Sequence, residues 1–114
     1  MRVLVSFGRE YRVYMEAIAS AIRGAHSDVQ VGVTYADELE AEVERFDPAL
    51  VITSLPVAAN LVDQQLGVIE LSPDTAQPSR FRVGERSWES INPTLGEILS
   101  VIDEIKSLRR HNQE

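Results

Sequence analysis

The segment Asp47–Pro56, with the sequence DPALVITSLP, decides the fold class of this chain. Its first two residues, Asp47 and Pro48, are typical of a turn, because proline fixes the backbone angle φ and cannot continue a helix. Residues 49–53 are apolar or β-branched, which predicts a strand covered on both faces. Ser54 stands where that strand ends. Ligands of open α/β sheets bind beyond the carboxyl ends of the strands, so Ser54 is a candidate site residue.

Two strands and two helices are predicted before this segment. Arg2–Phe7 is apolar and β-branched and ends at Gly8, and the valines of Val29–Thr34 alternate with small or polar residues, so both predict strands. Apolar residues recur at helical spacing across Tyr11–Ile22, and a narrower apolar stripe runs through Leu39–Phe46. The resulting β-α-β-α-β pattern predicts a doubly wound parallel sheet with right-handed crossovers and the strand order 2-1-3.

The second half of the chain has less room for helices between its strands. Pro56–Gln65 is too short for a comfortable crossover helix, and residues 72–79 carry two prolines and no helical period, which predicts a loop. Gly67–Leu71 and Arg80–Val83 predict strands four and five. We therefore expect an α/β fold with a mostly parallel five-stranded sheet, in the order 2-1-3-4-5, and shortened or missing third and fourth helices. Ser87–Ile91 fits a hairpin partner of the fifth strand.

The chain closes with its clearest amphipathic helix. Asn92 and Pro93 predict the start of that helix, with Asn92 as the N-cap and Pro93 at the first helical position. An apolar stripe then runs from Leu95 to Leu108. We expect one domain over residues 1–108 and a polar tail over residues 109–114.

Composition narrows the classes of function. The 114 residues suffice for one domain with its own core, and the formal net charge of −7 argues against binding to nucleic acid, which needs a basic surface. The absence of cysteine excludes disulfides and thiolate catalysis. No apolar run approaches the ~20 residues of a membrane span, and the chain enters a strand at once, which argues against a signal peptide. We expect a cytoplasmic protein that binds neither membranes nor nucleic acid.

With these elements in place, the chain resembles the receiver domain of bacterial response regulators, over roughly residues 2–72 and the last helix. Receivers share a proline, an apolar strand, a phospho-accepting aspartate and a later proline, and Pro48–Pro56 follows that pattern with Ser54 at the acceptor position. Ser72, at the end of the fourth strand, matches the receiver's switch hydroxyl. The resemblance implies a receiver-like or flavodoxin-like fold. The opening sequence Val-Leu-Val-Ser-Phe-Gly is also similar to that of small, uncharacterised bacterial proteins.

This chain lacks the residues with which receivers bind Mg²⁺ and accept a phosphoryl group. Receivers bind Mg²⁺ through an acidic pair at the end of strand one, where this chain has Ser6, Phe7 and Gly8. Ser54 cannot form an acyl phosphate, and Arg82–Arg86 contains no lysine to match the one that receivers place after strand five. A hard cation needs converging oxygen ligands, usually carboxylates. These departures indicate a degenerate pseudo-receiver that is not an enzyme and has no catalytic residues, metal or cofactor.

The carboxyl edge of the predicted sheet still gathers polar residues that would suit a small ligand or an anion. Gly8, beside a helix N-terminus, would let backbone N–H groups approach an anion, and Arg9 would add positive charge. A simpler interpretation is that Gly8 only makes the turn and that the serines cap loops, because a single glycine is weaker evidence than a full G-x-G-x-x-G motif. The candidate ligand-binding residues are Ser6, Gly8, Arg9, Ser54, Ser72 and Asp74.

Two functions therefore remain open. The leading hypothesis is a non-enzymatic domain that acts through protein–protein contacts, and the alternative is a module that binds a small ligand or an anion at the strand carboxyl edge. A homodimer is expected because shortened helices would leave apolar area of strands three and four uncovered. Trp88 either packs within the hairpin and last helix or anchors a partner. His26, beside Asp28, is interpreted as part of a solvated loop.

Overall fold

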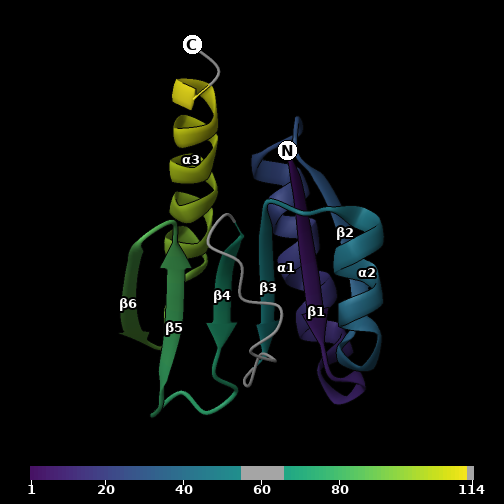
Figure 1. The fold of residues 1–114 in the computed structure, drawn as a ribbon. Coiled ribbons are helices and arrows are strands. Elements are labelled where there is room, and N and C mark those ends of the chain that lie inside the picture. Colours follow the sequence, from purple (N-terminus) through teal and green to yellow (C-terminus); the bar gives the residue numbers. More distant parts are fainter. Residues whose placement is uncertain (55–65, 113–114) are drawn as a thin grey trace.

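A six-stranded mixed sheet forms the centre of the computed structural model, which describes residues 1–54 and 66–112 (Figure 1). The strands are β1 (Arg2–Phe7), β2 (Gln30–Tyr35), β3 (Leu50–Ser54), β4 (Gly67–Leu71), β5 (Pro78–Val83) and β6 (Arg86–Ile91). The α-helices of the described residues are α1 (Arg12–Ala25), α2 (Leu39–Phe46) and α3 (Leu95–Asn112), and short 3-10 turns at Arg9–Tyr11 and Ala36–Glu38 precede the first two. None of the described helices is long and apolar enough to cross a bilayer.

The first four strands follow the expected parallel arrangement. β1 lies between β2 and β3, and β3 pairs with β4, all in parallel. Val5 of β1 is opposite Val33 on one side and Ile52 on the other, which fixes the register. The predicted strand order 2-1-3-4-5 is confirmed, and β6 is added at the outer edge. The expectation of a shortened third helix falls in residues 55–65, outside the described residues.

The last two strands correct the predicted mostly parallel five-stranded sheet. β5 is antiparallel to β4, and β6 is antiparallel to β5, so the sheet is mixed and has six strands. Residues 72–77 join β4 to β5 without a helix. A parallel connection needs a crossover of about a dozen residues or more, so this short loop forces the chain to turn back.

The predicted hairpin is confirmed between β5 and β6. Val83 pairs with Arg86, so only Gly84 and Glu85 form the turn. Gly84 has a φ of +60°, while Glu85 is not among the residues with positive φ. Glycine in the left-handed region at the first of two turn positions is the signature of a type II′ turn, whose twist suits a tight hairpin.

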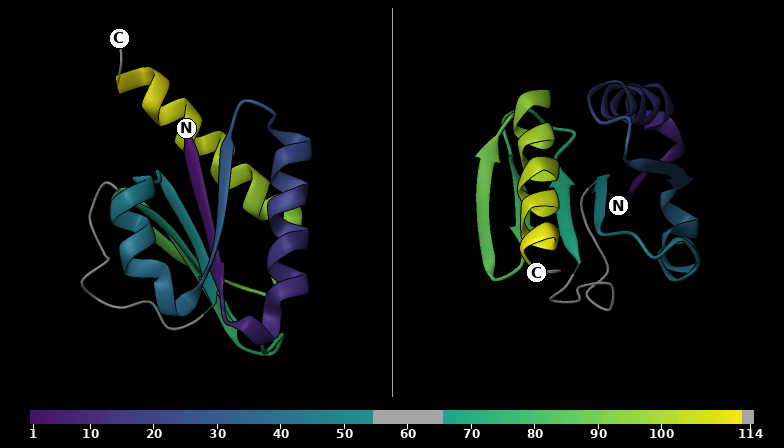
Figure 2. Two further views of the ribbon diagram at one scale, coloured as in Figure 1. Left: turned by 90° about the vertical axis from the view of Figure 1, so that its right-hand side faces the viewer. Right: turned by 90° about the horizontal axis from the view of Figure 1, so that it is seen from above.

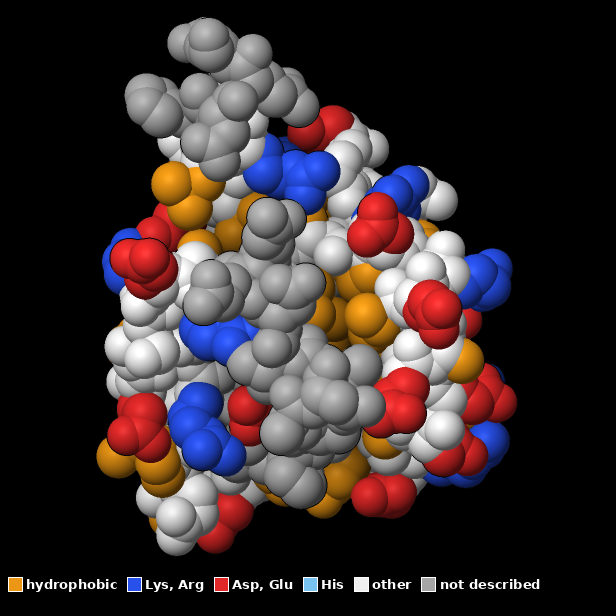
Figure 3. All heavy atoms as spheres, in the orientation of Figure 1, with side chains coloured by type: hydrophobic (Ala, Val, Ile, Leu, Met, Phe, Trp, Pro, Cys, Tyr) orange, Lys and Arg blue, Asp and Glu red, His pale blue; other side chains and the backbone are white. Residues whose placement is uncertain are grey.

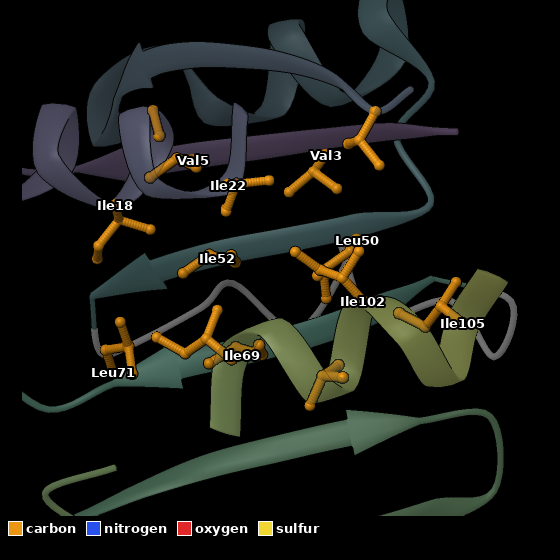
Figure 4. Close-up of a cluster of buried hydrophobic side chains, with 14 of the residues drawn as sticks. Val3, Val5, Ile18, Ile22, Leu50, Ile52, Ile69, Leu71, Ile102 and Ile105 are labelled. Carbon is orange, nitrogen blue, oxygen red and sulfur yellow. The ribbon is translucent and has the colours of Figure 1, made fainter. Parts of the chain in front are cut away.

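Helices lie on both faces of the sheet, with α1 and α3 on one face and α2 on the other (Figure 2). Since side chains alternate along a strand, Leu50 and Ile52 of β3 face α1 and α3, whereas Val51 faces α2. The larger of the two buried apolar clusters lies between the sheet and the helices α1 and α3 (Figure 4). The smaller cluster, on the α2 face, consists of Leu4, Leu39, Val51, Leu66 and Val68.

Helix α3 begins two residues later than the sequence predicts. The N–H of Glu97 donates to Oγ1 of Thr94 at 3.2 Å, so Thr94 is the N-cap, in place of the predicted Asn92. Asn92 instead has a φ of +48°, in the left-handed region that asparagine tolerates better than most residues, and it turns the chain from β6 towards the helix. At its other end the helix extends to Asn112, past the residue 108 at which the sequence placed the domain boundary.

A polar cluster fixes the C-terminal half of α3 to the loop after α1. Nζ of Lys106 lies 3.0 Å from Nδ1 of His26 and 2.7 Å from Oδ1 of Asp28. Nε2 of His26 lies 3.6 Å from Oδ1 of Asp103, and the His26 side chain is only 11% exposed. Because an ammonium has no lone pair, Lys106 donates and His26 accepts through Nδ1, which places the proton of a neutral ring on Nε2, towards Asp103. His26 thus belongs to a helix contact, which corrects its interpretation as part of a solvated loop.

Acid is expected to weaken this contact through Asp28. The pKa of Asp28 is lowered, first by the hydrogen bond from Lys106 and then by a backbone hydrogen bond. A carboxyl group whose pKa is lower in the folded state contributes stability above its unfolded pKa of about 3.9, and this contribution is lost as the pH falls through the folded value. We expect Asp28→Asn to be less stable than wild type near pH ~7, and this difference to shrink as the pH falls below about 4 and through the lowered pKa of Asp28. Urea unfolding across this range measures the difference.

The control is Glu85→Gln, which removes an exposed carboxylate from the hairpin turn. A stability difference between Asp28→Asn and wild type that stays constant, or grows, towards acid pH would contradict the prediction.

Candidate functional site

A pocket that encloses about 300 Å³ opens at the carboxyl edge of the parallel strands. It lies where β1, β3 and β4 end, beside the starts of α1 and α3. Its volume is at the lower end of the range of small-molecule sites. Its lining residues are Phe7, Tyr11, Tyr14, Ser54, Leu71, Ser72, Pro73, Thr75, Ser79, Asn92 and Pro93.

Apolar and aromatic side chains provide most of the pocket wall. Phe7 and Leu71 stand near the ends of β1 and β4 and are almost completely buried. The ring of Tyr14 meets that of Phe7 edge to face, with 5.5 Å between the centroids and 80° between the planes. Tyr11 and Tyr14 are three residues apart near the start of α1, so they lie on neighbouring positions of one helical side. One turn of the chain thus brings two tyrosine side chains to the wall of the pocket.

Serine hydroxyls supply polar groups next to the sheet. Oγ of Ser79 accepts a hydrogen bond from the backbone N–H of Ser72 at 2.9 Å, although Ser79 itself is 1% exposed. A hydroxyl has one proton and two lone pairs, so Ser79 keeps its proton for donation. Ser54, at the end of β3, is half-buried in the same pocket.

Ser72 and Asp74 mainly hold the loop between β4 and β5 in shape. Oγ of Ser72 donates to the carbonyl of Asp74 at 3.0 Å and accepts its N–H at 3.2 Å. Oδ1 of Asp74 accepts the N–H of Ala76 at 2.9 Å. Such side-chain turns are a common use of serine and aspartate. The loop-capping interpretation therefore holds for both residues, and Ser72 also lines the pocket.

Gly8 and Arg9 do not join the pocket. The guanidinium of Arg9 pairs with Asp37 at 3.5 Å and lies 4.2 Å from the centre of the Tyr35 ring, towards the end of β2. A Cβ added at Gly8 would lie 2.7 Å from Oε1 of Glu10, so a carboxylate already occupies the space beside this glycine. A negative charge at that point opposes an anion. The structure therefore does not assemble the anion site proposed from Gly8 and Arg9.

Ser6 lies on the opposite face of the sheet from the pocket. In the strand register it is opposite Thr34 of β2 and Thr53 of β3, and all three side chains are buried. Oγ of Ser6 has no hydrogen-bond partner among the described residues, whereas Thr53 donates to the carbonyl of Ser54 at 3.3 Å. Hydroxyls bring no negative charge to hold a hard cation.

The described residues contain no group of three or more histidine, aspartate or glutamate side chains that could hold a metal ion. A second hollow, of about 420 Å³, lies over β4–β6 on the α2 face. The charges of its described lining residues are balanced, with Glu70 and Glu89 against Arg80 and Arg82, and Glu70 pairs with Arg80 at 3.2 Å. Acidic and basic side chains are also interspersed over the face shown in Figure 3. Neither observation favours a strongly charged ligand.

The described lining residues of the pocket at the carboxyl edge are all uncharged. None of its lining residues in the described part of the chain is an acid, a lysine, an arginine or a histidine. Nucleophilic catalysis by serine requires a base and a group that orients it, and the described lining residues offer neither. Burying a charged group without a partner is costly, so an uncharged ligand fits this pocket best.

Several lining residues were missed by reasoning from the sequence. Tyr11 and Tyr14 were read only as part of a helical stripe, although their place just after the first strand puts them at the carboxyl edge. Ser79 lines the pocket because β5 turns back along β4, and Asn92 lines it from the turn between β6 and α3. The sequence left the role of Trp88 open. In the structure its ring stacks on the ring of Phe81 within the hairpin, with 5.2 Å between the centroids.

No family model matches the chain, and the searches of curated proteins and of solved structures find no match either.

Proposed function

We propose that this chain is a non-enzymatic binding module that takes up a small uncharged ligand at the carboxyl edge of its parallel strands. The observation that carries the proposal is the pocket of about 300 Å³, which combines aromatic walls with serine and asparagine side chains and has no charged lining residue among those described. Apolar walls with a few placed polar groups are the usual composition of a small-molecule site.

A matched set of probes tests the choice of ligand charge. Benzamide, benzoate and benzamidine have similar size and shape but are neutral, anionic and cationic. We expect benzamide to shift the backbone NMR signals of Ser54, Ser72 and Ser79 in a saturable way, and to bind at least about tenfold more tightly than either ion, since the described lining residues offer an ion no charged partner. The measurement is a titration followed by ¹H–¹⁵N correlation spectra.

The variant Ser54→Leu fills the pocket from its half-buried wall and is expected to abolish the shifts. Thr75→Leu, at an exposed rim position, gives a second way to narrow the pocket. Ser87→Leu is the matched control, because Ser87 is an exposed serine on β6 outside the pocket. The proposal fails if none of the three probes gives saturable shifts at the strand edge, or if benzoate binds as tightly as benzamide.

Protein–protein contact is a second candidate function, now on a different surface. The apolar residues of β3 and β4 expected to be exposed are buried within the single chain, Val51 and Val68 included, so they give no reason for a homodimer. Exposed apolar side chains of the described residues lie instead on other elements, and two of them, Tyr14 at 52% and Leu95 at 42% exposed, line the same groove between α1 and α3. Exposed apolar groups on one surface favour association. Light scattering at micromolar concentration supports this candidate if it gives twice the mass of the chain, and a monomer mass contradicts it.

A receiver-like origin is part of the same proposal. The parallel half with the order β2-β1-β3-β4 and the pocket at its carboxyl edge support it. On this view Ser54 lines the pocket from the position of the lost phospho-acceptor. The protein should therefore not be labelled by acetyl phosphate with Mg²⁺, and stable labelling at Ser54 would contradict the pseudo-receiver interpretation.

A further inference from the structure

A second hollow lies beside the pocket at the carboxyl edge, between α1 and α3. This groove encloses about 230 Å³ and is lined by Tyr14, Ala17, Ile18, Pro93, Leu95 and Ile98. Tyr14 and Pro93 line both the pocket and the groove, so the two spaces are adjacent and share these two residues as walls.

The two spaces differ in their chemistry. The polar residues Ser54, Ser79 and Asn92 line the pocket, whereas the described residues that line the groove are all apolar apart from Tyr14. Neither has a charged lining residue among those described. The polar groups therefore lie at the sheet end, and the apolar walls lie between the helices.

The walls of the groove also remain open to solvent. Tyr14 is 52% exposed and Leu95 is 42% exposed, while Ile98, deeper between the helices, is 2% exposed. Filling this groove with an apolar group would remove apolar surface of both the ligand and the protein from water, which is favourable in proportion to the area covered.

From these observations we infer that the site is bipartite and takes an elongated, uncharged, amphipathic small molecule. Its hydrogen-bonding end lies in the pocket near Ser54 and Ser79, and its apolar tail passes Tyr14 and Pro93 into the groove between α1 and α3. This inference rests on the proposed function and adds the shape of the ligand and its direction in the site.

A series of 4-alkylbenzamides tests the inference, with chains from methyl to hexyl added to the benzamide ring. The amide end is the same in every member, so only the tail changes. We expect the affinity to rise by about fourfold for each added methylene, until the groove is full. The longer members should also extend the NMR shifts from Ser54 and Ser79 to Ala17 and Leu95.

Ala17→Leu is the decisive variant, because Ala17 is exposed on α1 and a larger side chain there would occupy the groove without entering the pocket. We expect this variant to bind benzamide as wild type does and to lose the gain with chain length. Ala41→Leu is the matched control, an exposed alanine on α2 on the other face of the sheet. In Ala41→Leu the affinity should rise with chain length as much as in wild type.

The possible results separate the two proposals. If benzamide binds at the pocket but chain length brings no gain, the bipartite site is wrong and the proposed function stands. If the gain with chain length is the same in Ala17→Leu as in wild type, the tail binds elsewhere and the bipartite site is also wrong. If no member of the series binds at the pocket, both proposals fail.

Discussion

Replacing Phe81 with alanine is expected to lower the free energy of unfolding by about 3–5 kcal/mol. Phe81 is 1% exposed, lies opposite Ile69 of β4 and belongs to the larger buried cluster. Its ring also stacks on Trp88 with 5.2 Å between the centroids and 11° between the planes. The substitution would remove the largest fully buried side chain and leave a cavity between the hairpin and α3, so the transfer and cavity costs add.

Urea unfolding measured by circular dichroism gives the change in free energy, provided that the slope against denaturant stays constant. The control is Ile91→Ala, on the neighbouring strand β6, where the side chain is 66% exposed. Ile91→Ala should lower the free energy of unfolding by less than about 1 kcal/mol. If the two variants lose similar stability, the hairpin does not pack against the core as described.

Replacing Ile102 with alanine should lower the free energy of unfolding by about 2–5 kcal/mol. Ile102 is fully buried on α3 and belongs to the larger apolar cluster, between the helix and the sheet (Figure 4). In the described part of the chain no helix connects β4 to β5, and α3 covers this part of the sheet (Figure 2). Loss of packing at Ile102 therefore acts on the fold as a whole and not only on the end of the chain.

Leu108→Ala is the control on the same helix, since that side chain is 48% exposed. Its expected effect lies within about 0.5 kcal/mol, which is typical of surface positions. Thermal unfolding followed by circular dichroism provides a second measurement. An Ile102→Ala protein that unfolds like wild type would show that α3 contributes little to the stability of the sheet.

The elements with strong local patterns could be predicted from the sequence. β1 was predicted with its observed bounds, and the core of β3 was recognised because apolar residues 49–53 stand between a proline turn and a polar residue. The direction of β5 was missed because an apolar pattern does not show which way a strand runs. The six-residue connection before β5 held that information, since it is too short for a parallel crossover.

The site was harder to predict than the fold. Ser54 and Ser72 were placed correctly at the carboxyl edge, but Arg9 turns away because Asp37 and Tyr35 offer it partners that no local pattern reveals. The contact between Lys106 and His26 joins residues 80 positions apart. Such contacts depend on how α3 returns across the sheet, which the sequence pattern does not determine.

The positions of the two chain ends have a practical consequence. Met1 accepts a hydrogen bond from Gln30 at the start of β2, and α3 runs from the pocket towards the same end of the molecule (Figure 1). Both described ends therefore lie away from the pocket. A fluorescent label, an affinity tag or a surface linker attached at either end would leave the mouth of the pocket accessible, so immobilised protein should report ligand capture without steric interference.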